Sequence, residues 1–441
     1  MQIKKRQMMI GAGGAALSTL LPGSAGAVTA LVPPPMTLVA TYFGGWCKPM
    51  DASQRFVHGD NPWGVYPNAQ FPHLMHHMGD FPERFPLAGP PEGYDESQQS
   101  VIDEALVTAS SFGIDVFAVN WFRDEFLNHP VVNIKRSADK GLMKFFLQWS
   151  NNSNNSTQPP ADSREYFFEG IRRAAIHMKD SAYWTRNGKP VFAIYSVAQI
   201  DRIINLTLGR PANFNYPTIS QATLEHDAFL QDCHNIVANV IAGDDTGGIS
   251  GHLNATVVRN GTVVPASVNT SGIVGSFTPS MYLMVATGDV GSWARCASVQ
   301  GMYVYNTRSG KFPATATSPR LTHSFAEMAT ACQQVYDLVI PAMRNFAPGK
   351  VWWPTLMSGF DQKPWGGTTQ DPLHDNCLPT VEEFKNHCLQ VKAVHQQNPD
   401  VTGGVTFIYA WNELGEGGWI VPTPAIGTSR LEALRDSLKR V

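Results

Sequence analysis

Two glutamates, Glu413 and Glu416, lie three positions apart near the C-terminal end of the chain, in the segment WNELGEGGWIVP at residues 411–422. Charged residues make up only 16% of the sequence, so two acids this close together, beside two tryptophans, stand out. Hydrolysis of a glycosidic bond requires two carboxyl groups at one linkage, one protonated to assist the leaving group and one ionised. Two neighbouring carboxyl groups suit this need because they resist ionising together, which separates their pKa values. The segment therefore predicts a sugar-cleaving site with Glu413 and Glu416 as its catalytic pair, and a solvated acidic loop is the alternative.

The backbone between the two acids must turn sharply if both are to face one ligand. In an extended segment, positions 413 and 416 point to opposite sides. Gly415 and Gly417 permit a sharp turn, since glycine adopts backbone conformations that other residues avoid. We expect this turn to bring both carboxylates into one cavity.

Strand-like and helix-like segments alternate along the chain and must position these acids. Eight short, mostly apolar segments are typical of strands in a buried parallel sheet: 36–45, 114–121, 144–149, 190–196, 236–242, 281–287, 350–357 and 404–410. Helices are expected at 96–112, 131–140, 164–178, 221–235, 324–345, 381–397 and 428–439. This alternation predicts an α/β fold, a (β/α)8 TIM barrel. A doubly wound open sheet is the alternative, but no glycine-rich phosphate loop follows the first strand.

Two long insertions interrupt the alternation. Residues 47–95 are rich in Pro, Gly, His and aromatic residues. In residues 249–276, Gly, Asn, Thr and Val alternate, which indicates a β-hairpin. Long inserted loops tend to shape the mouth of a barrel, where ligands bind. No internal repeat or linker divides the chain, so residues 28–441 are expected to form a single catalytic domain.

Aromatic and short polar residues gather where the expected strands end, which is where a barrel binds its ligands. Aromatic rings stack on the apolar faces of sugars, and amide or carboxylate groups bind sugar hydroxyls. Any single tryptophan is more simply explained by core packing, but their recurrence at one end favours a glycan groove. The expected substrate-binding residues are Tyr42, Trp46, Trp121, Trp149, Asn151, Tyr195, Asp361, Trp365, Trp411 and Asn412.

The first 27 residues are typical of an export signal. Lys4, Lys5 and Arg6 precede an apolar stretch at 8–21, and the small residues AGA at 25–27 are typical of a cleavage site. The stretch is too short to span a bilayer, although a retained anchor is the alternative. It loosely resembles a twin-arginine signal without the arginine pair. We expect a periplasmic or secreted protein without stable membrane insertion after cleavage.

Charge and motif content argue against several other classes of protein. The net charge is −3 and no basic run occurs beyond the N-terminus, so a nucleic-acid partner is not expected. The six cysteines never adopt CxxC spacing, and no GxSxG elbow is present. His73, His76 and His77, with Asp80, have a spacing that suits a metal site. They lie in a proline-rich loop without a matching carboxylate motif, which argues against such a site. No metal or cofactor is therefore expected, and the expected partner is an oligo- or polysaccharide.

Further acids and cysteines leave questions open. Asp244 and Asp245 follow the segment expected as the fifth strand and are candidates for contacting sugar hydroxyls or a cation, but adjacent loop acids are usually solvated. Asp361 is a better candidate than Asp244 or Asp245 for a third acid at the site, because it follows an expected strand. Disulfide pairing cannot be deduced from the spacing, although Cys377 and Cys388 are the closest pair in sequence.

The motif WNELGEG at 411–417 resembles the WNEWxEG signature of glycoside hydrolase family 99-like proteins, which include endo-α-mannosidases and WbsX-type proteins described as glycosyltransferases. Further segments resemble that family in the same order: GDFP at 79–82, GYD at 93–95, FGIDVFA at 112–118, NGKPV at 187–191 and PTLMSGFDQKPW at 354–365. Each segment alone is a weak match, and the ordered set is specific. The resemblance extends over most of the chain after residue 27.

The resemblance implies a (β/α)8 barrel that retains anomeric configuration without a covalent glycosyl-enzyme ester. Glu413 is implied as a base on the substrate's 2-hydroxyl, which attacks C1 to form a 1,2-anhydro sugar. Glu416 is implied as general acid and then as base toward water, with Asn412 orienting the pair.

The chain departs from the family pattern at Leu414, Gly415 and Phe360, and in the segment TYFGGW at 41–46. These departures lie where substrate contacts are expected, so the resemblance does not identify the sugar that is bound. A glycosyltransferase and a carbohydrate-binding protein without catalysis are the alternatives. The export signal and the absence of a nucleotide-sugar motif argue against the former, and the intact acid pair argues against the latter.

Overall fold

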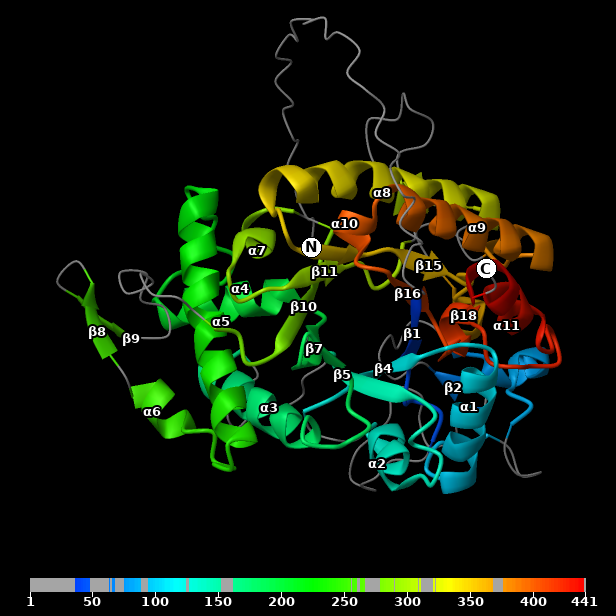
Figure 1. The fold of residues 1–441 in the computed structure, drawn as a ribbon, viewed down its shortest axis with the longest axis horizontal. Coiled ribbons are helices and arrows are strands. Elements are labelled where there is room, and N and C mark those ends of the chain that lie inside the picture. Colours follow the sequence, from blue (N-terminus) through cyan, green and yellow to red (C-terminus); the bar gives the residue numbers. More distant parts are fainter. Residues whose placement is uncertain are drawn as a thin grey trace, which may run out of the picture. The chain divides into compact units, whose positions relative to one another are not determined.

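A ring of parallel strands forms the centre of the fold (Figure 1). The computed structural model describes residues 36–47, 63, 66–67, 75–88, 94–123, 127–151, 162–254, 256–259, 262–265, 278–288, 290–307, 309–310, 320–321, 323–367 and 376–439. The ring contains β1 (Thr37–Tyr42), β4 (Val116–Trp121), β5 (Lys144–Trp149), β7 (Lys189–Ile194), β10 (Tyr282–Ala286), β11 (Gly301–Tyr303), β14 (Val351–Trp353), β15 (Thr355–Met357) and β16 (Val405–Tyr409). The expected signal segment at 1–27 lies outside the described residues.

The ring closes through one segment that serves as two short strands. Along residues 351–357, β14 pairs with β11 and β15 pairs with β16, while β16 pairs with β1. Pro354, which has no N–H to donate to a neighbouring strand, separates the two halves. The nine strands therefore occupy eight positions, and the predicted (β/α)8 barrel is confirmed.

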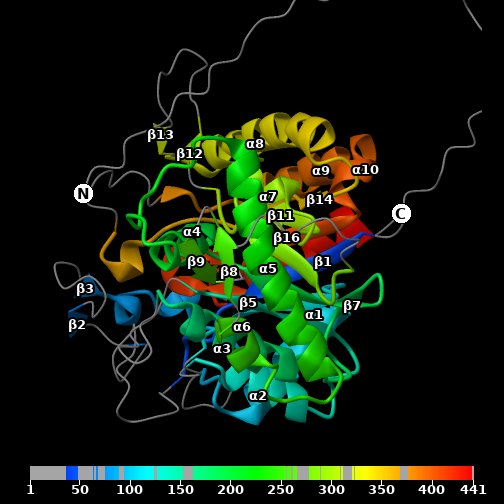
Figure 2. The same ribbon diagram turned by 90° about the vertical axis from the view of Figure 1, so that its left-hand side faces the viewer.

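Helices cover the outside of this ring. Figure 1 shows α8 (Phe325–Phe346) and α9 (Val381–Gln397) along one side of the strands, and α2 (His129–Arg136) and α3 (Arg164–His177) along the opposite side. The long helix α5 (Ile219–Ile241) crosses the face that is turned to the viewer in Figure 2. The other helices are α1 (Gln99–Ser111), α4 (Val197–Thr207), α6 (Ile249–Asn254), α7 (Ser292–Arg295), α10 (Pro399–Thr402), α11 (Ser429–Leu434) and a final π-helix at Arg435–Lys439.

Shorter elements decorate the loops. Single-turn 3-10 helices span Met78–Asp80, Pro82–Arg84, Lys363–Trp365 and Leu414–Glu416. Two-residue strands pair as β2 (Tyr66–Pro67) with β3 (Met75–His76), β12 (Ser309–Gly310) with β13 (Arg320–Leu321), and β17 (Asn412–Glu413) with β18 (Gly418–Trp419), and β6 (Thr185–Arg186) pairs with β7. The hairpin expected within 249–276 is confirmed by β8 (Thr256–Arg259) and β9 (Thr262–Pro265), which pair antiparallel after α6.

Side chains alternate along the ring between its interior and the helix layer. In β4 and β5, Asn120 and Gln148 point inward and hydrogen-bond to each other, Gln148 Nε2 donating to Asn120 Oδ1 at 2.6 Å. Their neighbours Trp121 and Trp149 point outward, where Trp149 packs on Phe167 of α3 at 4.7 Å between ring centroids. The phase of this alternation decides which residues reach the mouth of the barrel.

One of the eight sequence-based strand assignments is wrong, and one strand of the ring was not expected. The strand expected at 236–242 is the end of α5, whose buried positions Ile236, Val237 and Val240 follow a helical period. A short apolar run does not distinguish a buried strand from a buried helix. The strand that occupies the sixth position of the ring is instead β11, which has only three residues and begins at a glycine.

None of the six cysteines forms a disulfide, and all six are buried. In the described part of the chain, no helix combines the length and apolar character needed to cross a membrane.

The start of α9 offers a test of the local folding signals. Glu383 N donates to Thr380 Oγ1 at 3.2 Å and Thr380 N donates to Glu383 Oε2 at 2.9 Å, a reciprocal capping box. We expect Thr380→Ala to lower the free energy of unfolding by about 1 kcal/mol, measured by denaturant titration. Thr330→Ala, an exposed threonine inside α8, is the control and should change it by less than about 0.5 kcal/mol. Equal losses in the two variants would argue against the cap.

Candidate functional site

The two glutamates lie on a tight hairpin that follows β16. The pairs Asn412–Trp419 and Glu413–Gly418 join β17 to β18, and the 3-10 turn Leu414–Glu416 connects them. Trp411 N donates to Thr41 O at 2.7 Å, which ties the start of the hairpin to the end of β1. The hairpin is thereby held over the end of the barrel at which the parallel strands finish.

Two glycines let this turn fit against the loop that follows β15. Gly417 ends the 3-10 turn with φ of 78°, and a Cβ atom there would lie 2.2 Å from Asp361 N. A Cβ atom on Gly415 would lie 1.8 Å from Trp365 Nε1. The turn expected at Gly415 is therefore present, with the indole of Trp365 packed directly on it.

Glu413 is almost completely buried, with 3% of its surface exposed. Tyr305 Oη donates to Glu413 Oε1, whereas Glu413 Oε2 has no hydrogen-bond partner among the residues described. Burial, and next the charge of Glu416, raise the pKa of Glu413 well above its usual value, while the Tyr305 hydrogen bond opposes this rise. Oε1 of this carboxyl group is thus held by Tyr305, whereas Oε2 is shielded from solvent and accepts no hydrogen bond from the residues described.

Glu416 is half-buried and held by two donors. Tyr409 Oη donates to Oε2, and Gln362 Nε2 donates to Oε1 at 3.1 Å. Within the described part of the chain, neither Glu413 nor Glu416 is ion-paired with a lysine, arginine or histidine. Both carboxyl groups are therefore held by neutral donors.

Three tyrosines form a row beside the acids. Tyr195 meets Tyr305 edge-on at 5.1 Å between ring centroids, and Tyr305 meets Tyr409 edge-on at 5.3 Å. They come from the ends of β7, β11 and β16, so three positions of the ring converge on one cluster. Burial and the nearby glutamates raise the pKa of Tyr305 and Tyr409 well above 10, which keeps both hydroxyls protonated.

A buried ion pair supports the turn from behind. Arg84 Nη2 donates to Asp361 Oδ2 at 2.8 Å, and Arg84 Nη1 donates to the carbonyl oxygens of Asp361 at 3.1 Å and Leu414 at 3.3 Å. Asp361 N in turn donates to Glu416 O at 2.7 Å. Asp361 therefore fixes the backbone of the turn, and its carboxylate is engaged by Arg84.

Asn412 connects the hairpin to the loop after β1. Its Oδ1 accepts from Phe43 N at 2.7 Å, and its Nδ2 donates to Phe43 O at 2.8 Å and to Glu96 Oε1 at 2.7 Å. Glu96 Oε2 also accepts from Trp46 N at 3.0 Å, and burial raises the pKa of Glu96 to about 8. The Asn412 oxygen and nitrogen are both engaged in these bonds, so the side chain fixes the hairpin against the loop after β1.

The structure brings three of the other expected substrate-binding residues to the acids: Tyr195, Trp365 and Asp361. It directs the rest elsewhere. Trp121 and Trp149 lie in the layer against α3 because they occupy the outward phase of their strands. The remaining side chains are engaged in contacts away from the acid pair: Tyr42 with Tyr94, Trp46 with Asn412 O, Trp411 with Phe117, and Asn151 with both backbone groups of Ser196.

Sequence reasoning missed five residues that the structure places at the acids or directly beneath them: Asn120, Gln148, Tyr305, Gln362 and Tyr409. A signal for Asn120 and Gln148 was available, because a polar residue inside an apolar strand marks the inward face of a barrel. Tyr409 lies two positions before the first residue of the signature. Tyr305 followed a strand too short to be recognised.

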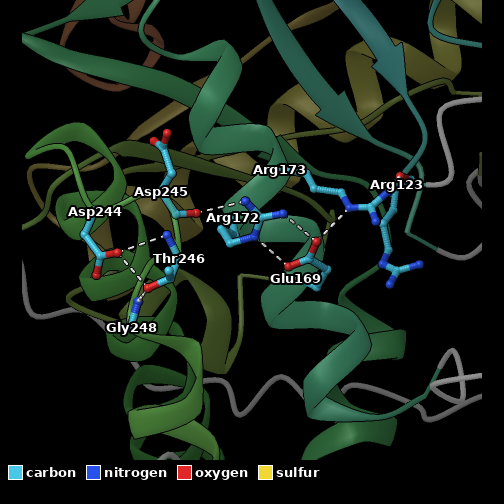
Figure 3. Close-up of polar contacts among 8 residues, drawn as sticks. All are labelled: Arg123, Glu169, Arg172, Arg173, Asp244, Asp245, Thr246 and Gly248. Atoms are coloured by element: carbon cyan, nitrogen blue, oxygen red, sulfur yellow. Dashed lines mark hydrogen bonds and ion pairs between the residues drawn. The ribbon is translucent and has the colours of Figure 1, made fainter.

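Asp244 and Asp245 lie among the outer helices, after α5 and not after a strand of the ring (Figure 3). Asp244 Oδ1 accepts from Thr246 N at 3.0 Å, and Asp245 O accepts from Arg172 of α3 at 2.9 Å. The expectation that they follow a fifth strand is wrong, since residues 236–241 are part of α5, and both side chains are exposed, as expected of solvated loop acids. His77 pairs with Asp80 at 3.1 Å, and no group of three or more potential metal ligands occurs among the residues that are described.

Comparisons with known proteins show a likeness of fold. No protein-family model matches the chain, and a search of curated proteins finds no match. A solved structure described as a glycoside hydrolase-like protein is similar, with 12% identity, a TM-score of 0.54 and coverage of 95% of this chain and 98% of that chain. Two structures of a GH99 endo-α-mannosidase from Bacteroides thetaiotaomicron, one in complex with bis-tris propane, have 13% identity, TM-scores of 0.49 and 0.47, and coverage of 91% of this chain and 95% and 97% of theirs.

The buried carboxyl group of Glu413 should reduce stability at neutral pH. Because its pKa is raised on folding, stability falls as pH rises from the unfolded value of about 4.3 through the folded value. We expect Glu413→Gln to raise the free energy of unfolding by about 1 kcal/mol at pH 8, and by less as the pH approaches 4, measured by denaturant titration. Glu416→Gln is the matched control and should raise it less, since that side chain is only half-buried. A gain for Glu413→Gln that is independent of pH would contradict this electrostatic explanation.

Proposed function

We propose that this chain is an exported glycoside hydrolase that cleaves an α-linked glycan with retention of configuration, through a 1,2-anhydro sugar. The observation that carries the proposal is the buried Glu413 Oε2, which lies beside a second carboxyl group and has no hydrogen-bond partner among the described residues. An unpaired acceptor in a dehydrated site is unfavourable unless a ligand supplies its hydrogen bond. A sugar hydroxyl has the chemistry to do so.

The resemblance of the 411–417 motif implies the roles of the two acids, Glu413 as the base and Glu416 as the general acid. The raised pKa of Glu413 makes its ionised form a strong base, which suits removal of a proton from a hydroxyl. The sugar's 2-oxygen then attacks C1 as the C1–oxygen bond to the leaving group breaks, and Glu416 protonates the departing oxygen. In the second half, Glu416 takes a proton from water as that water opens the anhydro ring at C1, and Glu413 returns its proton to the 2-oxygen. Two inversions at C1 give net retention.

The surroundings of the pair support a sugar ligand. Tyr195, Tyr305, Tyr409 and the indole of Trp365 surround the hairpin, and aromatic rings of this kind stack on the apolar faces of sugars. The resemblance of the 411–417 motif to the family 99-like signature, and the barrel that this chain shares with a glycoside hydrolase-like protein, point the same way. Export is proposed from the first 27 residues of the sequence.

Glu416→Gln tests the assignment of the general acid. We expect it to lower kcat/KM by about 10²–10⁴-fold on glycans with poor leaving groups, and to retain much of the activity on activated aryl glycosides, which need no proton. The measurement is a comparison of kcat/KM across leaving groups, with the exposed Glu382→Gln as a control that should be unchanged. A uniform loss on both kinds of substrate would contradict the acid role.

A substrate that lacks the 2-hydroxyl tests the anhydro-sugar route. We expect a 2-deoxy analogue of the cleaved glycan to bind, by calorimetry, without turnover, because Glu413 has no proton to remove. Rapid cleavage of the analogue would exclude the anhydro-sugar route, but it would still be consistent with a glycoside hydrolase. A parallel incubation with nucleotide sugars separates the alternatives, since transfer from these donors without cleavage of plain glycans would instead indicate a glycosyltransferase.

A further inference from the structure

A chain of hydrogen bonds runs through the barrel interior and ends on Glu413. Tyr303 Oη donates to Gln148 Oε1 at 2.9 Å, and Gln148 Nε2 donates to Asn120 Oδ1 at 2.6 Å. Asn120 Nδ2 donates to Tyr305 Oη at 2.9 Å, and Tyr305 Oη donates to Glu413 Oε1. The chain crosses β11, β5 and β4, and its two amides are buried, with 0% of Gln148 and 4% of Asn120 exposed.

Every bond in this chain points in the same direction. A hydroxyl group can donate or accept, but an amide nitrogen only donates and an amide oxygen only accepts. Asn120 Oδ1 is occupied by Gln148, so Asn120 presents its N–H₂ group to Tyr305. Tyr305 Oη must therefore accept from Asn120, and its own hydrogen is left for Glu413.

We propose that Asn120 and Gln148 are positioning residues that fix the direction of the Tyr305 hydrogen bond, so that this hydroxyl always donates to Glu413 Oε1 and Oε2 remains for the substrate. The inference rests on the proposed function, in which Glu413 must be ionised to act as a base. It assigns a role in the reaction to two amides that lie beneath the acid pair, one and two hydrogen bonds behind Tyr305.

This directed donation opposes the other influences on Glu413. Burial and Glu416 both favour the protonated form of Glu413, and Glu96 from the loop after β1 adds to them. A hydrogen bond donated to a carboxylate favours its ionised form. The groups that face Glu413 or the turn that bears it are Glu416 on the same turn, Tyr409 of β16, Tyr305 after β11, Glu96 after β1, and the Arg84–Asp361 ion pair.

Asn120→Asp reverses the direction with almost no change in shape. The new carboxylate accepts from both Gln148 and Tyr305, so the Tyr305 hydroxyl is drawn away from Glu413. The added negative charge would itself raise the Glu413 titration midpoint, so the same substitution is also made together with Tyr305→Phe, where there is no hydroxyl to redirect. The difference between the two effects isolates the direction of the hydrogen bond.

The readout is the carboxyl titration of Glu413, followed by ¹³C NMR in protein labelled only at the glutamate δ-carbon, so that the introduced aspartate is silent. All variants carry Glu416→Gln, which makes the midpoint a property of Glu413 alone and not of a coupled pair. The Glu413 signal is identified by its loss in Glu413→Gln. Asn205→Asp, a buried amide of α4 outside the chain of hydrogen bonds, is the control for a buried acid and should leave the midpoint unchanged.

We expect Asn120→Asp to raise the midpoint by about one to two pH units more in the presence of Tyr305 than in the Tyr305→Phe background. Equal shifts in the two backgrounds would overturn the proposal. Gln148→Glu is the second variant, should Asn120→Asp fail to fold, and the extra glutamate signal that it adds is recognised because Glu413→Gln does not remove it. Its carboxylate accepts from the Asn120 amide, which must then turn its oxygen to Tyr305, and the same excess shift is expected, with equal shifts again overturning the proposal.

Activity supplies an independent arm. With Glu416 restored, Asn120→Asp should move the acid limb of kcat/KM for a cleaved glycan to higher pH. If no glycan is cleaved by the unmodified protein, the proposed function fails, whereas the NMR titration still decides whether the amides direct the hydrogen bond.

Discussion

The repulsion between the buried Glu413 and the neighbouring Glu416 is the constraint on which this end of the barrel depends. Such a pair is stable only if the surrounding groups donate hydrogen bonds and hold the backbone rigidly. The protein meets this with neutral donors at the acids, Tyr305, Tyr409 and Gln362, whereas Arg84 binds Asp361 and the carbonyl of Leu414 behind the turn. A cation in contact with either acid would ease the repulsion, but it would also lower the pKa of that acid, which would make it a weaker base and keep it ionised at neutral pH.

The same constraint explains why the hairpin contains so little freedom. Trp365 packs on Gly415, the Asp361 backbone packs on Gly417, and Asn412 uses its whole amide to hold Phe43 and Glu96. These contacts come from two loops, the one after β15 and the one after β1, so the two acids are positioned by the convergence of separate strand ends. This is the general advantage of a barrel, in which rigid strands deliver several loops to one place.

Much of this was predictable from the sequence, and the failures have physical causes. The acid pair, its turn and seven of the eight ring positions were predicted from local pattern. The ends of β4 and β5 were also placed correctly, but Trp121 and Trp149 were assigned to the ligand although they occupy the outward phase, one residue from the inward Asn120 and Gln148. Composition at a strand end does not reveal its face. Tyr305 was missed because β11 is only three residues long. Residues 236–242 were misassigned because a short apolar run does not distinguish a buried strand from a buried helix.

The clamp between Asn412 and Phe43 joins positions 369 residues apart, and β1 and β16 pair directly beneath it. During synthesis, the first strand of the ring must wait for nearly the whole barrel to be translated before its last neighbour exists. Loops that close over such sequence separations form slowly. The acid pair is therefore positioned only as the ring is completed, and a nascent or truncated chain that ends before β16 does not contain it.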